Sequence, residues 1–170
     1  MRTNLLAAIL DRIEAKVPAI IWIDKDWGQL EIPAESYPLQ FPCALVSFPD
    51  IPWNQLKGGY YDGVVTVNVR VAIDMYNDTY TVGNVTAPDR ATALSRMNIV
   101  DDLNAGLSGF EDTWFQKLVH IESKEEKRAD GLLVFNEIYE TRLTDNSAVP
   151  VRTTVVPKYK IDGMFADKVE

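Results

Sequence analysis

The clearest pattern in the chain is the strict alternation of apolar and polar residues between Val64 and Tyr76. Every second side chain is apolar, and the apolar set is Val65, Val67, Val69, Val71, Ile73 and Met75. Only an extended strand places such a set on one face. A single buried face is typical of an antiparallel sheet. We therefore expect a long strand with a core face, and an opposite face (Thr66, Asn68, Arg70 and Asp74) turned toward water, a lumen or a partner.

Two amphipathic helices are expected to cover the apolar face of this strand. The first spans residues 3–17, with Thr3 as its N-cap and Pro18 as its stop. Its apolar stripe is Leu6, Ile9, Leu10, Ile13 and Val17. The second helix follows Thr86 and ends near Gly106 and Gly109. Its expected buried side is Leu94, Met97, Val100, Leu103 and Leu107.

The remaining strands are predicted from shorter signals. Residues 20–23 form a short strand, and Cys43–Phe48 is apolar on both faces, as in a central strand. Residues 114–121 and 132–143 pair as a hairpin across the charged turn 122–131, whereas 51–61 and 77–86 are loops. Regular helices do not separate the strands, which disfavours βαβ repeats. The order predicts an α+β fold with an antiparallel or mixed sheet and two helices on one face.

A chain of 170 residues is long enough for one domain with its own core. We assign residues 1–145 to this domain. Residues 146–170 contain a strand-like TTVV, the break at Pro157 and the segment KYKIDGMF. We expect this extension to be an edge strand or an arm that packs on another subunit.

Charge and cysteine content narrow the functional classes. Seventeen basic and 25 acidic residues give a net charge of −8, whereas nucleic-acid binding needs clustered basic residues. Cys43 is the only cysteine, so no intramolecular disulfide forms and a reducing compartment is expected. No apolar run approaches the roughly 20 residues of a membrane span. We expect a soluble, cytoplasmic protein.

Few residues are candidates for chemistry. His120 is the only histidine, and a lone strand histidine is more often structural or exposed than catalytic. Cys43 lies in an apolar run, where thiols are inert, so a pair with His120 is disfavoured. One cysteine and one histidine cannot close a zinc site. Asp24, Asp26 and Glu35 match a calcium loop in spacing, but Gln29 stands where that loop requires glycine.

The other acidic pairs, Asp101-Asp102 and Glu111-Asp112, are expected to be solvated surface charge. The basic residues Lys124, Lys127 and Arg128 are offset by glutamates at 122, 125 and 126. Motifs for nucleotide, metalloprotease or serine hydrolase sites are missing. We therefore predict no catalytic residue, no cofactor and no metal. A small thioesterase-like enzyme that uses a carboxylate is the less favoured alternative.

The layout resembles the tail terminator and tail-completion proteins of long-tailed bacteriophages and prophages. The features that carry the resemblance cover about residues 1–145. They are the first helix ending at Pro18, the strand IIWID, the strand PCALV at Pro42–Val46, Trp53, the long VxVxVxV strand, the Leu94–Leu107 helix and the closing hairpin. The ending from Asn146 departs from the compact end of that family.

The resemblance implies a structural protein that forms a ring, commonly a hexamer, at the end of the tail tube. Its implied partners are copies of itself, the tail tube and head-connector proteins, without sequence-specific nucleic-acid or membrane binding. The implied location is the cytoplasm during assembly and then the virion tail. The alternative is an α+β ligand-binding or regulatory module unrelated to phage, without catalytic activity.

Overall fold

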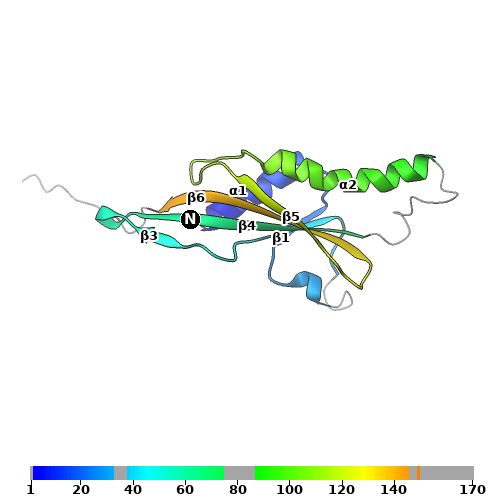
Figure 1. The fold of residues 1–170 in the computed structure, drawn as a ribbon, viewed down its shortest axis with the longest axis horizontal. Coiled ribbons are helices and arrows are strands. Elements are labelled where there is room, and N and C mark those ends of the chain that lie inside the picture. The colour runs from blue at the N-terminus through cyan, green and yellow to red at the C-terminus, as the bar shows by residue number, and fades with distance from the viewer. Residues whose placement is uncertain (1, 33–37, 75–86, 146–148, 150–170) are drawn as a thin grey trace, which may run out of the picture.

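Two long antiparallel strands form the centre of the computed structural model, which describes residues 2–32, 38–74, 87–145 and 149. Strand β4 spans Tyr61–Asp74 and strand β6 spans Leu132–Asp145 (Figure 1). They pair along their whole length, from Tyr61 opposite Asp145 to Asp74 opposite Leu132. The alternation in β4 is fully realised, because the buried side chains of one face are Val65, Val67, Val69, Val71 and Ile73.

The described strands form a six-stranded mixed sheet in the order β1-β2-β4-β6-β5, with β3 added to β4. Strand β1 (Trp22–Lys25) runs parallel to β2 (Cys43–Ser47), and the other pairs are antiparallel. Strand β5 (Val119–Glu126) pairs with β6, and β3 (Trp53–Gln55) pairs with the start of β4. Two short 3₁₀ helices, η1 (Gln29–Glu31) and η2 (Lys57–Gly59), lie in the connections.

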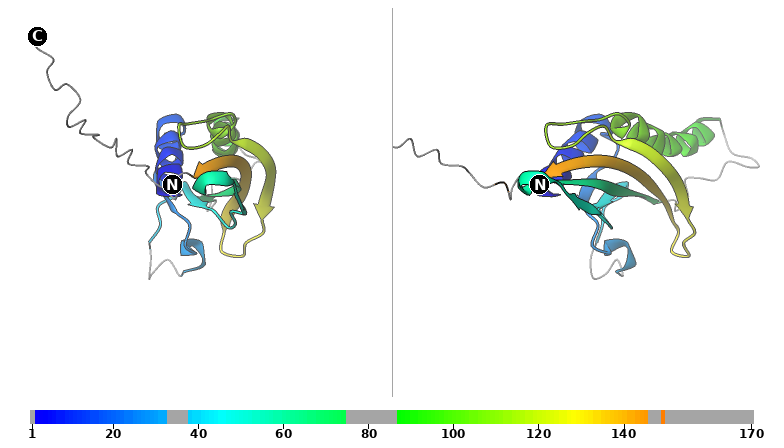
Figure 2. Two further views of the ribbon diagram at one scale, coloured as in Figure 1. Left: turned by 90° about the vertical axis from the view of Figure 1, so that its left-hand side faces the viewer. Right: turned by 60° about the vertical axis from the view of Figure 1, so that its left-hand side comes forward.

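Both α-helices lie on one face of this sheet (Figure 2). Helix α1 spans Arg2–Lys16 and helix α2 spans Ala87–Leu107. They bury a hydrophobic cluster against β4, and its helical members are Leu5, Ile9, Ile13, Ile99, Val100, Leu103 and Leu107. Removal of this apolar surface from water is the main force that drives folding. The predicted α+β class, with two helices on one face, is confirmed.

The two helices approach each other closely at their C-terminal ends. A Cβ atom at Gly106 would lie 3.1 Å from the Cβ of Lys16, so a larger residue here would require Lys16 to shift by a few tenths of an ångström. The side chain of Arg12 donates a 2.9 Å hydrogen bond from its Nε to the carbonyl oxygen of Gly106. Gly106 therefore permits the helix contact. It lies one residue before the end of α2 at Leu107, so the predicted end of this helix is confirmed.

The opposite face of the sheet carries a smaller hydrophobic cluster. It contains Leu30, Cys43, Leu45, Ala72 and Val134. Strand β2 therefore buries residues on both faces, as predicted for a central strand. The cluster covers one end of the face that the sequence predicts to be mostly polar, at Ala72.

The helix predictions are partly wrong. Thr3 lies inside α1, and Leu5 is buried whereas Leu6 and Leu10 are only half-buried. In α2, Leu94 and Met97 are exposed, at 51% and 40%. Figure 1 shows why, since the first part of α2 extends beyond the end of the sheet. The predicted N-cap, Thr86, lies outside the described residues.

Three strand predictions also need correction. The first short strand is shifted by two residues, to Trp22–Lys25, and Ile21 is exposed. The loop predicted for 51–61 contains β3, which packs so closely that a Cβ at Gly63 would lie 2.8 Å from the Trp53 ring. Strand β5 begins at Val119 and includes the charged residues 122–126, which had been read as turn. The predicted hairpin itself is confirmed.

The predictions for Met75, for the 77–86 loop and for nearly all of the 146–170 extension fall outside the described residues.

Candidate functional site

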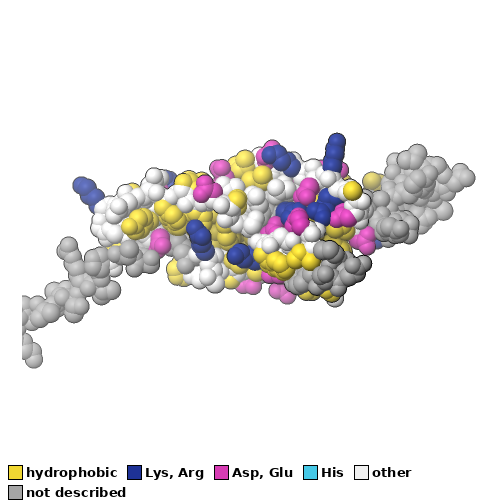
Figure 3. All heavy atoms as spheres, turned by 90° about the horizontal axis from the view of Figure 1, so that it is seen from below, with side chains coloured by type: hydrophobic (Ala, Val, Ile, Leu, Met, Phe, Trp, Pro, Cys, Tyr) yellow, Lys and Arg dark blue, Asp and Glu magenta, His cyan; other side chains and the backbone are white. Residues whose placement is uncertain are grey.

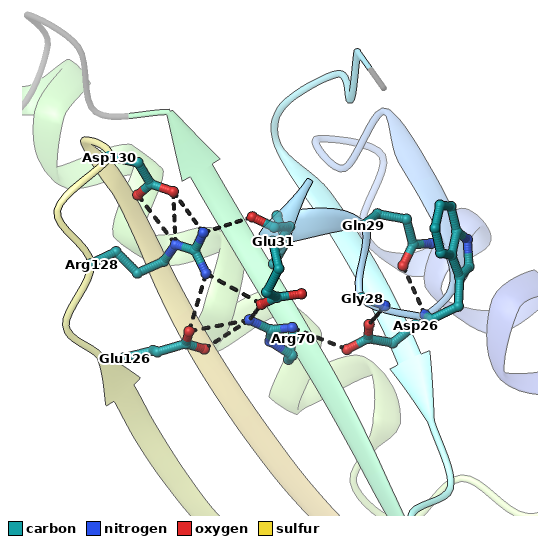
Figure 4. A network of polar contacts seen from close by, with 10 residues as sticks. Asp26, Gly28, Gln29, Glu31, Arg70, Glu126, Arg128 and Asp130 are labelled. Carbon is teal, nitrogen blue, oxygen red and sulfur yellow. Dashed lines mark hydrogen bonds and ion pairs between the residues drawn. The ribbon is translucent and has the colours of Figure 1, made fainter. Parts of the chain in front are cut away.

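The described residues contain two polar networks, one on each face of the sheet. The first lies on the face opposite the helices and centres on Arg70 of β4 (Figure 4). The guanidinium of Arg70 contacts the carboxylates of Asp26, Glu31 and Glu126, at 3.4, 2.8 and 3.0 Å. The Arg70 side chain is only 15% exposed. Arg70 therefore does not face an open lumen, as the sequence had allowed, but holds three carboxylates within its own chain.

A second arginine extends this network. Arg128 pairs with Glu31, Glu126 and Asp130, at 3.4, 3.2 and 2.6 Å. It also donates a 2.7 Å hydrogen bond to the carbonyl oxygen of Leu30. Charge-assisted bonds of this kind fix geometry well. The network therefore joins the segment around η1 to the turn between β5 and β6, about one hundred residues later in the chain.

The network changes the acidity of its exposed members. A side-chain hydrogen bond from Arg70 is the main cause that lowers the pKa of Glu31 below its ordinary value. The hydrogen bond from Arg128 likewise lowers the pKa of Asp130. Both carboxylates are therefore held in the charged form, as ion-pair partners rather than as proton donors.

The segment that resembles a calcium loop is used for local structure. The Oδ1 atom of Asp26 accepts a 2.9 Å hydrogen bond from the backbone N–H of Gly28, whose φ of +98° suits glycine. The buried Gln29 amide donates to the Lys25 carbonyl at 2.7 Å and to Asp24 at 3.3 Å. Glu35 lies outside the described residues. The described residues include no group of three or more acidic, histidine or cysteine side chains placed to hold a metal.

The second network lies under α2, in the helix-covered core, and sequence reasoning missed it. Glu137 of β6 is fully buried, directly opposite Val69 of β4. Its carboxylate contacts the Nε2 of His120 at 2.7 Å, the hydroxyl of Ser123 at 2.5 Å and the amide nitrogen of Asn104 at 3.0 Å. Asn104 in turn accepts a hydrogen bond from the Tyr139 hydroxyl. Partners of this number are what a buried carboxylate needs to remain in the core.

This arrangement does not form a nucleophile with its base. Ser123 and His120 each contact Glu137, through different oxygen atoms, and their described contacts do not join them to each other. His120 is half-buried and stacks near the Tyr139 ring, with 5.0 Å between ring centroids. The structural interpretation of His120 therefore fits its contacts.

Cys43 and His120 are not brought together. Cys43 belongs to the cluster on the face opposite the helices, whereas His120 lies opposite Tyr139, whose side chain is in the helix-covered core. Burial is the main cause that raises the pKa of the Cys43 thiol, to about 11. A thiol in this state is a poor nucleophile.

The remaining charged candidates lie on the surface. The acidic pairs at 101–102 and 111–112 are exposed, as expected. The basic residues near the hairpin are offset by acids, with Lys124 at 2.7 Å from Glu122. Figure 3 views the face opposite the helices and shows acidic and basic side chains interspersed on it. No described helix is both long and apolar enough to cross a membrane.

The outer edge of β5 is one of the two edges of the described sheet, and β1 forms the other. This strand ends the sheet, and within the described residues no further strand pairs with its outer edge. Val119 and Ile121 are 55% and 53% exposed on it. Unpaired edges with apolar side chains are templates for pairing with another chain. Other exposed large hydrophobic residues are Ile21, Trp27, Leu56, Tyr60, Val64, Leu94, Met97 and Trp114.

A pocket of about 410 Å³ lies where the second helix passes the end of the sheet. It is lined by Ala19, Phe41, Pro42, Ile73, Asp74, Arg96 and Ile99. Its volume lies within the range of small-molecule sites. Arg96 donates a 2.7 Å hydrogen bond to the carbonyl oxygen of Asp74. The guanidinium is therefore already engaged with the backbone at the pocket wall.

Comparison with known proteins shows a structural likeness but no family. No protein-family model matches the chain, and no curated protein matches it either. The chain is similar to a chain in the solved structure of the virion of the native gene transfer agent (GTA) particle. The identity is 13%, the likeness covers 83% of this chain and 95% of the other, and the TM-score is 0.49. A likeness of this degree does not define a family or a function.

The Arg70 network generates a pH-dependent prediction. Glu31 has a lowered pKa when folded, so its contribution to stability is present above the unfolded pKa near 4.5 and is lost as the pH falls. Arg70→Met should destabilise the protein at pH 7 and much less at pH 3.5, measured as the urea midpoint at each pH. Lys25→Met, at an exposed position of β1, is the control. A stability difference that does not change with pH would contradict this role of Arg70.

The Glu137 network generates a second prediction. Glu137→Ala leaves the donors of Asn104, Ser123 and His120 without their acceptor, so we expect a loss of roughly 2–4 kcal/mol in the free energy of unfolding. Glu140→Ala, at an exposed position of the same strand, should change it by less than about 0.5 kcal/mol. Urea denaturation measures both. Equal stability of the two variants would show that the buried network does not stabilise the core.

Proposed function

We propose that this protein is a structural component of a phage or prophage particle, and that it acts as a tail terminator or head–tail joining subunit in a ring at the end of the tail tube. The order of elements on which the family resemblance depends supports the proposal. A first helix, three short strands, the long alternating strand, the second helix and a hairpin follow one another in the fold.

The observation that carries the proposal is the outer edge of β5. A chain that works alone normally protects an edge strand by charge, proline or a covering segment. Charged side chains protect residues 122–126 of this edge, and a bulge interrupts its register at Ile121. The first part of the edge is apolar and exposed, at Val119 and Ile121, with no covering strand among the described residues. Such an edge suits a subunit that completes its sheet with another chain.

Charge is compatible with a ring around DNA. The chain carries a net charge of −8, so its overall field repels phosphate and does not retain the passing nucleic acid. Arg70 and Arg128, which are largely buried, are paired with carboxylates of their own chain. The proposed role also requires no catalytic residue, since a ring subunit works by binding its neighbours.

The pocket beside Arg96 favours a second candidate function. A cavity of about 410 Å³ with one charged wall suits a small ligand. Under this alternative the chain is a ligand-binding or regulatory module unrelated to phage. It then works without a ring.

The test is to mix the purified protein with isolated tail tubes that lack their terminal protein. Light scattering measures mass with and without tubes, and electron microscopy measures tube length and end structure. We expect a mass of several times 19.2 kDa on the tubes, and rings at one end of each tube. Glu140→Ala is a control for surface change that leaves the β5 edge intact. A protein that stays monomeric and leaves tube ends bare would overturn the proposal.

A further inference from the structure

We propose that the segment 151–160 of one copy binds the outer edge of β5 in a second copy, with residues 151–156 as the added strand. This inference rests on the proposed assembly function and names the contact that joins neighbouring subunits. The acceptor is the outer edge of β5, with no pairing strand among the described residues. The donor is the C-terminal segment VRTTVVPKYK, which follows the last described strand after a short link.

The donor has the composition of a strand. Five of its first six residues are β-branched, the exception being Arg152, and β-branched side chains favour extended backbone. Pro157 then removes a backbone donor and ends the stretch. Six residues are enough for strand addition, in which main-chain hydrogen bonds supply affinity and side chains supply selectivity.

The charges of the two segments are complementary. The donor contains Arg152, Lys158 and Lys160 and no acidic residue. The acceptor strand VHIESKEE contains three glutamates and one lysine. Within its own chain, Glu126 already pairs with Arg70 and Arg128, and Glu122 pairs with Lys124. Opposite charges placed across neighbouring strands attract, and complementary charge also sets register and partner choice. The valines of the donor provide apolar partners for the exposed Val119 and Ile121.

The link between the end of β6 and the donor segment favours pairing between copies rather than within one chain. Strand β6 ends at Asp145, and the space beside its last residues, on the side of β5, is already filled. There Phe115 bridges to Leu143, and the Gln116 N–H donates to the Arg142 carbonyl at 3.0 Å. A link of residues 146–150 spans up to about 17 Å, which exceeds the roughly 10 Å of two strand spacings. The filled space, and not the length of the link, therefore opposes pairing with β5 of the same chain, since the link would have to pass around this segment.

The contact joins two different surfaces, because each copy supplies one donor segment and one acceptor edge. A heterologous contact of this kind gives a ring when its rotation closes and an open filament when it does not, and the proposed function requires the ring. A symmetric dimer would instead require a self-complementary surface.

Cross-linking between single-cysteine variants tests the contact directly. In a Cys43→Ala background, one protein carries Ile121→Cys and another carries Thr153→Cys, and a short bis-maleimide reagent is added to their mixture. We expect a covalent product of twice the monomer mass from this mixture. Lys25→Cys, at the other end of the sheet, replaces Ile121→Cys in the control mixture and should give at least about tenfold less product. Circular dichroism checks the fold of each variant.

A protein with both Ile121→Cys and Thr153→Cys distinguishes the two topologies. Linkage only within single chains, with no product from the mixture, would overturn pairing between copies. Equal product from the Ile121→Cys and Lys25→Cys mixtures would show random collision and would also overturn it.

Charge reversal separates this contact from the proposed function. Glu122→Lys with Glu125→Lys should reduce cross-linking about tenfold, and Arg152→Glu with Lys158→Glu in the partner should restore it. Failure of rescue would contradict the charge pairing. If cross-linking occurs but tail tubes are not capped, the contact stands and the phage role fails. If tubes are capped without cross-linking, the role stands and this contact fails.

Discussion

The in-register ladder between β4 and β6 determines the rest of the structure. The two strands pair over fourteen residues each, without a bulge. Because side chains alternate across a strand, this register decides which residues of both strands share a face. Val69 and Glu137 lie opposite each other on the helix side, and Arg70 lies opposite Asn136 on the other side. A slip of one residue would exchange the two sets.

Each face of the ladder is then completed in a different way. The helix side is closed by apolar packing from α1 and α2, with Glu137 satisfied by three polar neighbours from α2 and β5. On the other side, Arg70 and Arg128 attach the segment around η1 to the hairpin turn. These attachments fix the two faces, which leaves the two edges of the described sheet, β1 and β5, as the places where it can grow. The proposed assembly uses the β5 edge, which carries exposed Val119 and Ile121.

Sequence reasoning succeeded where a signal was local and repeated. The valine alternation predicted β4 and its buried face, and the apolar run after Pro42 predicted a central β2. Glu137 was missed because its strand has Glu, Tyr and Thr at successive core positions, which makes the alternation untidy. Counting every second residue from Leu133 to Leu143 would have placed this carboxylate in the core, and a buried carboxylate signals a polar network.

The other errors concern relations between distant residues. A helical stripe shows which side of α2 is apolar, but it does not show how far the sheet extends, so Leu94 and Met97 were placed in the core. Strand β3 forms because Gly63 leaves room for the Trp53 ring. No local sequence pattern predicts this contact. The charged half of β5 was read as turn because an edge strand that faces water has no apolar period. The Arg70 network likewise joins segments that are far apart in sequence.

Native-state hydrogen exchange tests the central role of the ladder most directly. Amides of β4 and β6 that bond to each other should exchange only through global unfolding, with one common free energy that rises and falls with overall stability. Amides directed outward from β5 should exchange faster by orders of magnitude in the isolated subunit, since their edge has no described partner. Slower exchange in β1 or β5 than in the β4–β6 ladder would contradict the account.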